Sequence, residues 1–251
     1  MEIITLTPET LDQEHICCAI ANNKDIQVAS KKAWLAARMK DGLVFKKGNI
    51  RGKCFIEYIP AEKAWAPVTA DGYMYIDCLW VSGQFKGLGY STQLLDECIN
   101  DSKAKKKNGL VVLSSKNKKL PFLSDPSYLK YKGFIEADSA EPYFTLMYLP
   151  FIKSAEKPCF KAQAKKPEVK EKEFVLYYTH QCPFTAKYVP LLEQTAKNNE
   201  VKLVTHCFET AEQAQQAPTP FTTFSLFCDG KFITHEILSD KKFEEIITAR
   251  K

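Results

Sequence analysis

Residues 76–95 constrain the fold more than any other part of this 251-residue chain. They join a β-rich run to a helical run through a loop at residues 84–89, in which Gly87 and Gly89 flank one leucine. Glycine adopts backbone conformations that are closed to other residues and lets a ligand approach the main chain. A helix beginning near Gly89 would direct unpaired N–H groups and a partial positive charge toward the loop, and Lys86 adds a full charge. The segment therefore predicts a site for an anion such as a pyrophosphate.

Two common phosphate-binding motifs do not fit this loop. A dinucleotide fingerprint needs G-x-G-x-x-G and a nucleotide P-loop needs G-x-x-x-x-G-K-[ST], and the run Gly-Leu-Gly-Tyr at residues 87–90 supplies neither. The pattern Q-x-x-G-x-G after an apolar strand instead resembles the acetyl-CoA signature of the GNAT N-acetyltransferases; the alternative is an ordinary glycine-rich turn. The resemblance implies a cosubstrate site made of Leu79, Trp80, Val81, Gln84, Phe85, Lys86, Gly87, Leu88, Gly89 and Tyr90.

Composition narrows the class of protein. Hydrophobic residues make up 45% of the chain and charged residues 26%, as in ordinary globular proteins, and no apolar run approaches the roughly 20 residues that cross a bilayer. The first residues lack the basic stretch of a signal peptide. The nine cysteines show no zinc-site spacing, which favours free thiols. We therefore expect a cytoplasmic protein without a membrane segment or a metal site.

Charge and length give two further expectations. The net charge is +5, and the lysines are scattered or bunched near expected helix ends. This charge is compatible with a CoA-like polyanion but implies no nucleic-acid partner. A chain of 251 residues more often forms two domains than one.

Apolar periodicity predicts a mixed order of strands and helices over residues 1–150. Helices are expected at residues 7–21, 28–39, 90–106 and 126–132, and strands at 3–6, 43–45, 54–59, 73–81, 110–113, 134–135 and 143–149. The strands before the glycine loop should form an antiparallel meander. The run Tyr-Lys-Gly-Phe at residues 131–134 resembles the helix-to-strand ending common in GNAT domains. The resemblance implies an α/β (α+β) GNAT fold with a mixed, mostly antiparallel sheet.

A change in composition separates a second domain. Residues 151–172 are rich in lysine and proline without a periodic apolar face, which indicates a charged linker. Residues 173–251 then predict the order βαβαββα, with strands at 174–178, 201–207, 223–228 and 232–237 and helices at 183–197, 209–216 and from 241. This order is similar to a smaller thioredoxin-like fold. The tandem arrangement resembles the YoaP-type acetyltransferases.

Acyl transfer to an amine needs a base, and Asp77 is the candidate. Period-two alternation puts Tyr73, Tyr75, Asp77 and Leu79 on one face of a strand, and Asp77 occupies the position where many GNAT domains carry a glutamate that faces the site. Its carboxylate would accept the amine proton directly or through water. The alternative is a structural ion pair with a lysine or arginine.

The general acid is less defined by the sequence. GNAT domains that use tyrosine place it four residues before the glycine of the helix-to-strand ending, where this chain has Leu129. Tyr128 and Tyr131 flank that position, and Tyr128 is our candidate; the alternative is a core aromatic residue. Asn117 stands near the position of an asparagine that often follows the fifth strand.

The turn at residues 179–185 resembles the active-site turn of glutaredoxin-like proteins. Cys182 would lie at a helix N-terminus, where the dipole lowers a thiol pKa. Thr185 occupies the place of the second cysteine of C-x-x-C, so we expect either a monothiol site or an inherited scaffold, with Pro218 or Pro220 as the cis-proline.

Together these features predict an acetyl-CoA-dependent N-acetyltransferase that acts on an amine. The alternative is a non-catalytic acyl-CoA-binding module whose C-terminal domain docks a protein partner. Contact with such a partner, or with a second copy of the chain, is compatible with either reading.

Overall fold

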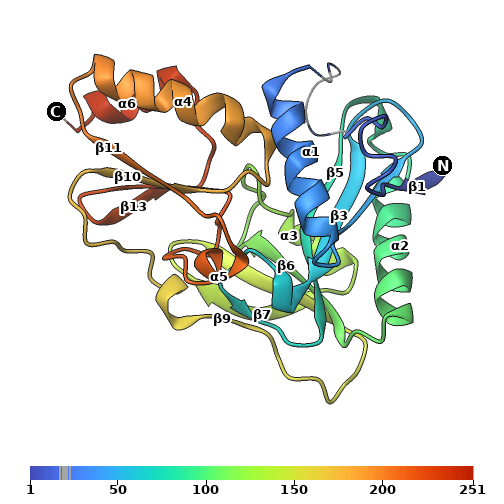
Figure 1. Ribbon diagram of the computed structural model, residues 1–251. Helices are drawn as coiled ribbons and strands as arrows, with labels where there is room; N and C mark the ends of the chain where they lie inside the picture. The colour runs from blue at the N-terminus through green and yellow to red at the C-terminus, as the bar shows by residue number, and fades with distance from the viewer. Residues whose placement is uncertain (17, 19–21, 23, 251) are drawn as a thin grey trace.

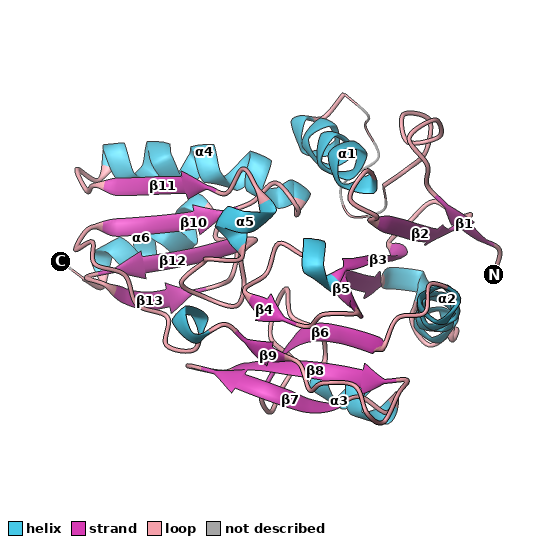
Figure 2. Ribbon diagram, turned by 60° about the horizontal axis from the view of Figure 1, so that its bottom comes forward, coloured by secondary structure: helices cyan, strands magenta, loops and turns pink. Residues whose placement is uncertain are grey.

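The structure is a computed structural model that describes residues 1–16, 18, 22 and 24–250. Its larger sheet, part of which is labelled in Figure 1, has seven strands in the order β1-β2-β3-β5-β6-β8-β7, which can be followed in Figure 2. Neighbouring strands are antiparallel, except that β5 and β6 are parallel. The expected mixed, mostly antiparallel sheet is therefore present. The strands are β1 (Ile3–Thr5), β2 (Val44–Gly48), β3 (Cys54–Pro60), β5 (Tyr73–Val81), β6 (Gly109–Ser115), β7 (Ile135–Ala140) and β8 (Phe144–Pro150).

Helices cover both faces of this sheet and bury two apolar cores. On one face lie α2 (Tyr90–Ala104) and the short α3 (Pro126–Tyr131). Leu94, Leu95 and Cys98 point from one side of α2 into the core beneath it, which is the helical spacing that an amphipathic helix requires. On the other face lies α1 (Ile26–Met39), which begins at an Asp25 cap.

A second, four-stranded sheet has the order β11-β10-β12-β13 (Figure 2). Helices α4 and α6 share one core with its strands. The elements follow the predicted βαβαββα order, and together we call them the second unit. They are β10 (Phe174–Tyr178), α4 (Pro183–Asn198), β11 (Leu203–Cys207), α5 (Ala211–Ala214), β12 (Phe224–Cys228), β13 (Lys231–Thr234) and α6 (Asp240–Thr248).

The second unit packs against the face of the large sheet that carries α1. Helix α4 lies beside α1 (Figure 1). Residues 1–150, which contain the larger sheet, are called the first sheet region below. Phe221 and Phe232 from the second unit join the same apolar core as Trp65 and Phe144 of this region. The two sheets are therefore joined through a continuous apolar contact.

The segment predicted as a linker, residues 151–172, runs along the larger sheet. It contains strand β9 (Cys159–Phe160), which pairs with β4 (Val68–Thr69), and the one-turn helix η3 (Ala162–Ala164). Phe160 is buried, and Lys165 forms an ion pair of 2.8 Å with Asp138. Two further one-turn helices, η1 (Ala61–Lys63) and η2 (Gly83–Phe85), precede β4 and α2. The charged segment is thus docked on the sheet.

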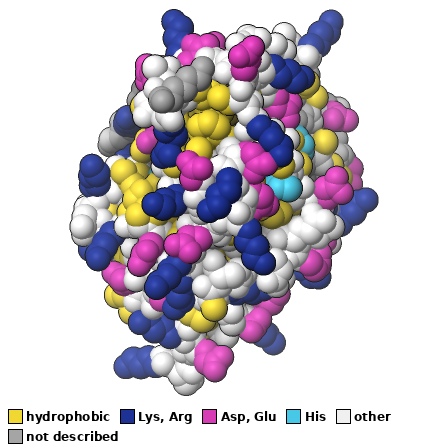
Figure 3. Space-filling view, turned by 90° about the vertical axis from the view of Figure 1, so that its left-hand side faces the viewer, with side chains coloured by type: hydrophobic (Ala, Val, Ile, Leu, Met, Phe, Trp, Pro, Cys, Tyr) yellow, Lys and Arg dark blue, Asp and Glu magenta, His cyan; other side chains and the backbone are white. Residues whose placement is uncertain are grey.

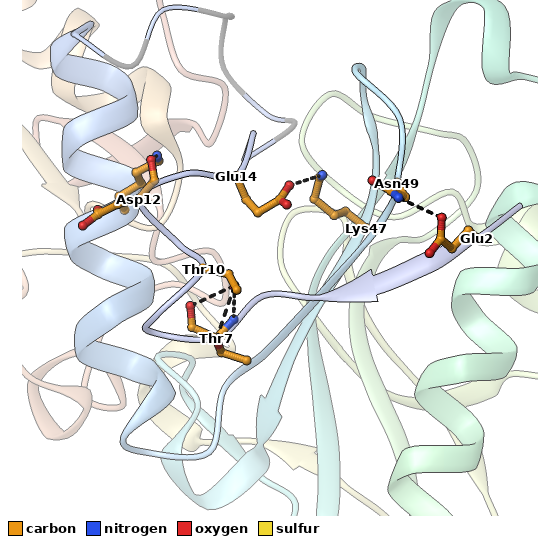
Figure 4. A network of polar contacts seen from close by, with 8 residues as sticks. Glu2, Thr7, Thr10, Asp12, Glu14, Lys47 and Asn49 are labelled. Atoms are coloured by element: carbon orange, nitrogen blue, oxygen red, sulfur yellow. Dashed lines mark hydrogen bonds and ion pairs between the residues drawn. The ribbon is translucent and has the colours of Figure 1, made fainter.

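The helix expected at residues 7–21 is wrong over its described part. Residues 8–13 form turns, and the prediction at 17 and 19–21 lies outside the described residues. The Thr10 hydroxyl bonds the backbone N–H and C=O of Thr7 (Figure 4), and such local bonds compete with a helix. An ion pair of 2.8 Å between Glu14 and Lys47 ties the segment to β2.

The surface carries charges of both signs. On the face shown in Figure 3, lysine and arginine side chains are interspersed with acidic ones, and apolar side chains form only small patches. Among the helices of the described residues, none is long and apolar enough to cross a membrane.

Candidate active site

A cavity of about 820 Å³ opens between the larger sheet and the second unit. The first sheet region contributes the end of β5, the glycine loop, the start of α2 and residues 119–125 with 128–129. The second unit contributes residues 181–184 and 220–223. Residues 79–91 form what we call the loop end of the cavity. The carboxylate end comprises Lys31, Glu57, Asp77, Gln181 and Cys182.

The loop end brings together most of the residues predicted for the cosubstrate. Gln84 and Leu88 are not on the cavity wall, and Leu88 points to the exterior with 55% of its side chain exposed. The residues on the wall are Leu79, Trp80, Val81, Phe85, Lys86, Gly87, Gly89 and Tyr90.

The two loop glycines have the conformation that the sequence predicts. Gly87 has φ +79° and Gly89 has φ +76°, values that favour glycine. A Cβ atom added to either would meet nothing within 4 Å, so open space borders the main chain here. Gly89 caps α2 without a side-chain hydrogen bond. The first N–H groups of the helix therefore have no cap and are available to an anion.

Strands β5 and β6 separate along their length. Their parallel pairing covers Tyr73 to Ile76 on β5, whereas the antiparallel pairing of β5 with β3 continues to Val81. Past Ile76, one edge of the β5 main chain has no strand partner among the described residues. This free edge borders the cavity, and an extended chain bearing amide groups can pair with it.

Asp77 lies in a β-bulge, because Cys78 faces Glu57 and Ile76 faces Tyr58 across the β3–β5 pair. One extra residue on β5 breaks the alternation of faces. Tyr73, Tyr75 and Cys78 consequently pack on the α1 side, while Leu79 packs on the α2 side. The prediction that Leu79 shares a face with Tyr75 is therefore wrong.

A buried ion pair stands beside Asp77. Lys31 Nζ on α1 lies 2.5 Å from Glu57 Oε2 on β3, and both side chains are 1% exposed. Burial, the largest single influence, lowers the pKa of Lys31, but the neighbouring acidic groups, with Glu57 first among them, together raise it more, so the pKa is raised overall. The other carboxylate oxygen, Glu57 Oε1, is buried without a hydrogen-bond partner among the described residues.

These surroundings change the acidity of Asp77. Its pKa lies well above the usual range, first because the group is enclosed and second because the Glu57 charge is close. Lys31 and a hydrogen bond from the Gln181 side chain lower it less. Asp77 also remains in contact with the cavity. A carboxyl group with a raised pKa is a stronger base than an ordinary aspartate, which suits it to take a proton from an amine.

Of the candidates for the acid, only Tyr128 is on the cavity wall. Its hydroxyl is buried and lacks a geometric hydrogen-bond partner among the described residues. Burial raises its pKa, and the nearby hydroxyls of Ser91 and Thr92 lower it less. Tyr131 is 82% exposed, and Asn117 is exposed and outside the wall.

The second unit places Cys182 at the N-cap of α4, as expected. Burial nevertheless raises the pKa of this thiol to about 11, so the helix terminus does not make it a thiolate. The Thr185 hydroxyl donates to the carbonyls of Thr179 and Cys182, both at 2.8 Å. The proposed cis-prolines are wrong, because the cis bond among the described residues precedes Pro142.

Lys31, Glu57 and Gln181 were not predicted from the sequence as site residues. Glu57 carried a signal, because it interrupts the otherwise apolar strand Cys-Phe-Ile-Glu-Tyr-Ile at residues 54–59, and a charge on such a strand needs a buried partner. Nothing local identified the partner, since Lys31 lies 26 residues away. Gln181 was within a recognised turn, but its contact with Asp77 depends on how the two sheets dock.

Comparison with known proteins gives two sequence matches. The family described as YoaP-like matches residues 203–245. The uncharacterized N-acetyltransferase YoaP of Bacillus subtilis (strain 168) is 43% identical over 245 residues, which is 97% of each chain.

Solved structures give weaker likenesses. The PaiA N-acetyltransferase of Thermoplasma acidophilum, in complex with coenzyme A, has a TM-score of 0.41 at 15% identity, over 60% of this chain and 100% of that one. A GNAT family acetyltransferase of Brucella melitensis, in complex with acetyl-CoA, has a TM-score of 0.38 at 15% identity, over 64% and 96%.

Proposed function

Because the chain belongs to the family of YoaP-like N-acetyltransferases, we propose that it transfers the acetyl group of acetyl-CoA to an amine. One observation carries this proposal. A single cavity connects a glycine loop at a helix N-terminus with Asp77, a carboxyl group whose pKa is raised. The first feature suits the pyrophosphate of CoA, and the second suits proton removal from an amine.

The cosubstrate is proposed to lie along the loop end. Gly87, Gly89 and the first turn of α2 would hold the pyrophosphate, with Lys86 adding charge. The open space beside both glycines is compatible with this close approach. The pantetheine amides would pair with the free edge of β5 at residues 79–81, where backbone N–H groups are also available to polarise the thioester carbonyl.

The proposed reaction is a direct transfer. The lone pair of a neutral amine attacks the thioester carbon, so that an N–C bond forms while the C–S bond breaks. The amine proton passes to the Asp77 carboxylate, and the sulfur leaves as the CoA thiolate. Tyr128 is the proposed proton donor to that thiolate, since its hydroxyl has no competing geometric hydrogen bond among the described residues.

For the second unit we propose a thioredoxin-like architecture without dithiol chemistry. The strand order β11-β10-β12-β13, with only β10 and β11 parallel, supports it, and Thr185 stands where a second cysteine would be. We assign residues 1–150 to the acetyltransferase domain, 151–172 to the connection and 173–251 to this domain. A cytoplasmic location fits acetyl-CoA as cosubstrate.

Two measurements test the function. Calorimetric titration with acetyl-CoA measures binding, and release of the CoA thiol in the presence of an amine panel measures transfer. Binding together with amine-dependent release is the expected result. Binding without release for any amine would favour the non-catalytic acyl-CoA-binding module, and absence of binding would refute both functions.

A further inference from the structure

We propose that the second unit builds the acceptor half of the cavity, and that this half takes a small amine with an apolar body rather than a lysine of a folded protein. The inference rests on the proposed acetyl transfer. It assigns a role to the second unit and a class to the acceptor.

The first support is a contact between the second unit and Asp77. Gln181, just before α4, lies on the cavity wall together with Asp77, and its side chain is close enough to lower the pKa of that carboxyl group. The second unit thus holds one of the groups that would act on the acceptor. Gln181 is a positioning residue, because it acts through Asp77.

The second support is the chemistry of the cavity wall. The second unit contributes Phe184, Pro220 and Phe221 to this wall, and the first sheet region contributes Trp65 and Tyr75. Sites lined by aromatic side chains with a few polar groups bind apolar ligands and orient them through the polar ones. An amine with an aromatic or aliphatic body fits this lining.

The third support is the distribution of charge. Lys31, whose charge lowers the pKa of Asp77, already forms an ion pair with Glu57. Glu57 Oε1, in contrast, has no hydrogen-bond partner among the described residues although Glu57 borders the cavity. A donor such as an N–H group satisfies that oxygen, whereas a carboxylate on the acceptor would meet two acidic groups.

The fourth support is that the second unit is fastened on several sides of the cavity. His235 Nε2 donates to the Pro121 carbonyl at 2.8 Å, and its Nδ1 accepts from the Tyr143 hydroxyl at 2.7 Å. Thr222 donates to the Trp65 carbonyl. Helix α4 packs on α1 at another side. These contacts hold the second unit against the cavity, and the space of about 820 Å³ between the two sheets takes a small amine without rearrangement.

The closing experiment compares acceptors. With saturating acetyl-CoA, CoA release is measured for 2-phenylethylamine, for an N-terminally blocked peptide with one lysine, and for a folded protein rich in surface lysines. We expect kcat/KM for 2-phenylethylamine to exceed that of either polypeptide by roughly tenfold or more, the scale of apolar pocket discrimination. Equal or faster acetylation of the polypeptides overturns the inference and leaves acetyl transfer standing. Loss of acetyl-CoA binding in a parallel titration would instead refute the proposed function.

A wall variant tests whether the second unit forms the pocket. Phe184→Ala should raise KM for 2-phenylethylamine by roughly tenfold with acetyl-CoA affinity unchanged. Leu191→Ala, on the same helix but 41% exposed and outside the wall, is the matched control. Equal KM values in the two variants, both folded by circular dichroism, would overturn the assignment.

A second variant tests Gln181 as a positioning residue. Gln181→Met removes a side-chain amide that lowers the pKa of Asp77, so the acid limb of the kcat/KM profile should move to higher pH. Gln194→Ala, exposed on α4, should not move it. The charged and titratable groups that interact with Asp77 and stay in both variants are Lys31, Glu57, Tyr75 and Cys78, and Cys182 interacts with Lys31 and Glu57 of the same cluster. An unshifted limb in Gln181→Met overturns the role of Gln181.

Discussion

The two ends of the cavity are built in opposite ways. The loop end consists of consecutive residues, 79–91, whose main chain and helix terminus are the proposed binding groups. The carboxylate end collects side chains from α1, β3, β5 and the turn before α4. Lys31 and Gln181 in that set are 150 positions apart in the sequence. One end depends on local backbone conformation, and the other depends on how the whole chain packs.

This difference separates two tasks. A helix N-terminus beside two glycines binds the same anionic group whatever the acceptor is. The carboxylate end decides which acceptor is bound and how its proton leaves, and it changes whenever any of the contributing segments changes. Substitutions of the loop-end residues that lie on the cavity wall should therefore abolish cosubstrate binding, whereas those at the carboxylate end should affect stability, turnover and acidity in separable ways.

The largest effect is expected at the loop end. Gly87→Glu places a side chain in the open space beside the main chain and a negative charge near the proposed pyrophosphate site. The positive φ of Gly87 adds a strain of about 1–2 kcal/mol, which the fold should tolerate. We expect no detectable acetyl-CoA binding by calorimetry and no acetyl transfer.

Leu88→Glu is the control for Gly87→Glu. It adds the same charge one residue later on an exposed side chain outside the cavity wall. It should keep acetyl-CoA affinity within a few-fold of the parent value. If the Gly87 variant binds as well as this control, the loop is not the pyrophosphate site.

The next effect tests the packing that creates the carboxylate end. Lys31→Met leaves the Glu57 carboxylate buried without its cation, and breaking a buried pair in this way costs about 3–5 kcal/mol. Urea denaturation should report this loss in the free energy of unfolding. The double variant Lys31→Met with Glu57→Leu removes both charges and should recover much of it. A single variant within 1 kcal/mol of the parent would mean that the pair is not needed for packing.

The loop end could be predicted from the sequence and the carboxylate end could not, because the first depends on local conformation and the second on how the whole chain packs. Gly87, Gly89 and the start of α2 were predictable because a turn and a helix terminus are local. The β-bulge at Asp77 was not, because it exists only in the register between β3 and β5. The strand face assigned to Leu79 failed for that reason. Likewise, Gln181 reaches Asp77 only through docking of the second unit, which no local pattern records.

A smaller effect, on turnover, is expected from Asp77→Asn. The amide has nearly the same shape but does not take up the amine proton, so kcat on a verified acceptor should fall by roughly 10²-fold. Acetyl-CoA affinity should stay near the parent value, which would sharpen the separation of the two ends. Asp71→Asn, in an exposed turn, is the control. A fall of less than a few-fold across the pH range would make Asp77 a structural residue.

The contact between the two sheets should respond modestly to pH through His235. Burial lowers the pKa of this imidazole, and the Pro121 carbonyl and the Glu236 charge raise it less. The unfolded chain therefore takes up a proton at a pH where the folded chain does not. The stabilisation is complete above about pH 6.5, the ordinary value, and is lost as pH falls toward the folded pKa.

Urea midpoints at pH 7.5, 6.5 and 5.5 measure this effect. The decrease in the free energy of unfolding should be at most about 1.4 kcal/mol for each unit of pKa shift. His235→Gln keeps a donor and an acceptor and should make the decrease smaller, and the part that remains is expected from His15 and His180, whose pKa values are lowered first by burial. An unchanged pH dependence in the variant would mean that His235 is not the titrating group.

The smallest effect concerns the reactivity of Cys182. The two ends of the cavity each contain a helix N-terminus, but we expect only the one at the loop end to hold a negative charge. Both the glycine loop and the Cys182 turn precede a helix, and a helix terminus favours negative charge. At Cys182 the enclosure outweighs the helix and raises the thiol pKa to about 11, so roughly one thiol in ten thousand is ionised at pH 7. Brief treatment with iodoacetamide at pH 7, followed by mass spectrometry, should therefore label Cys182 at least about tenfold more slowly than the exposed Cys159. Labelling of Cys182 as fast as Cys159 would mean that the carboxylate end is open to water, and the contrast between an open anion site and an enclosed acceptor site would then fail.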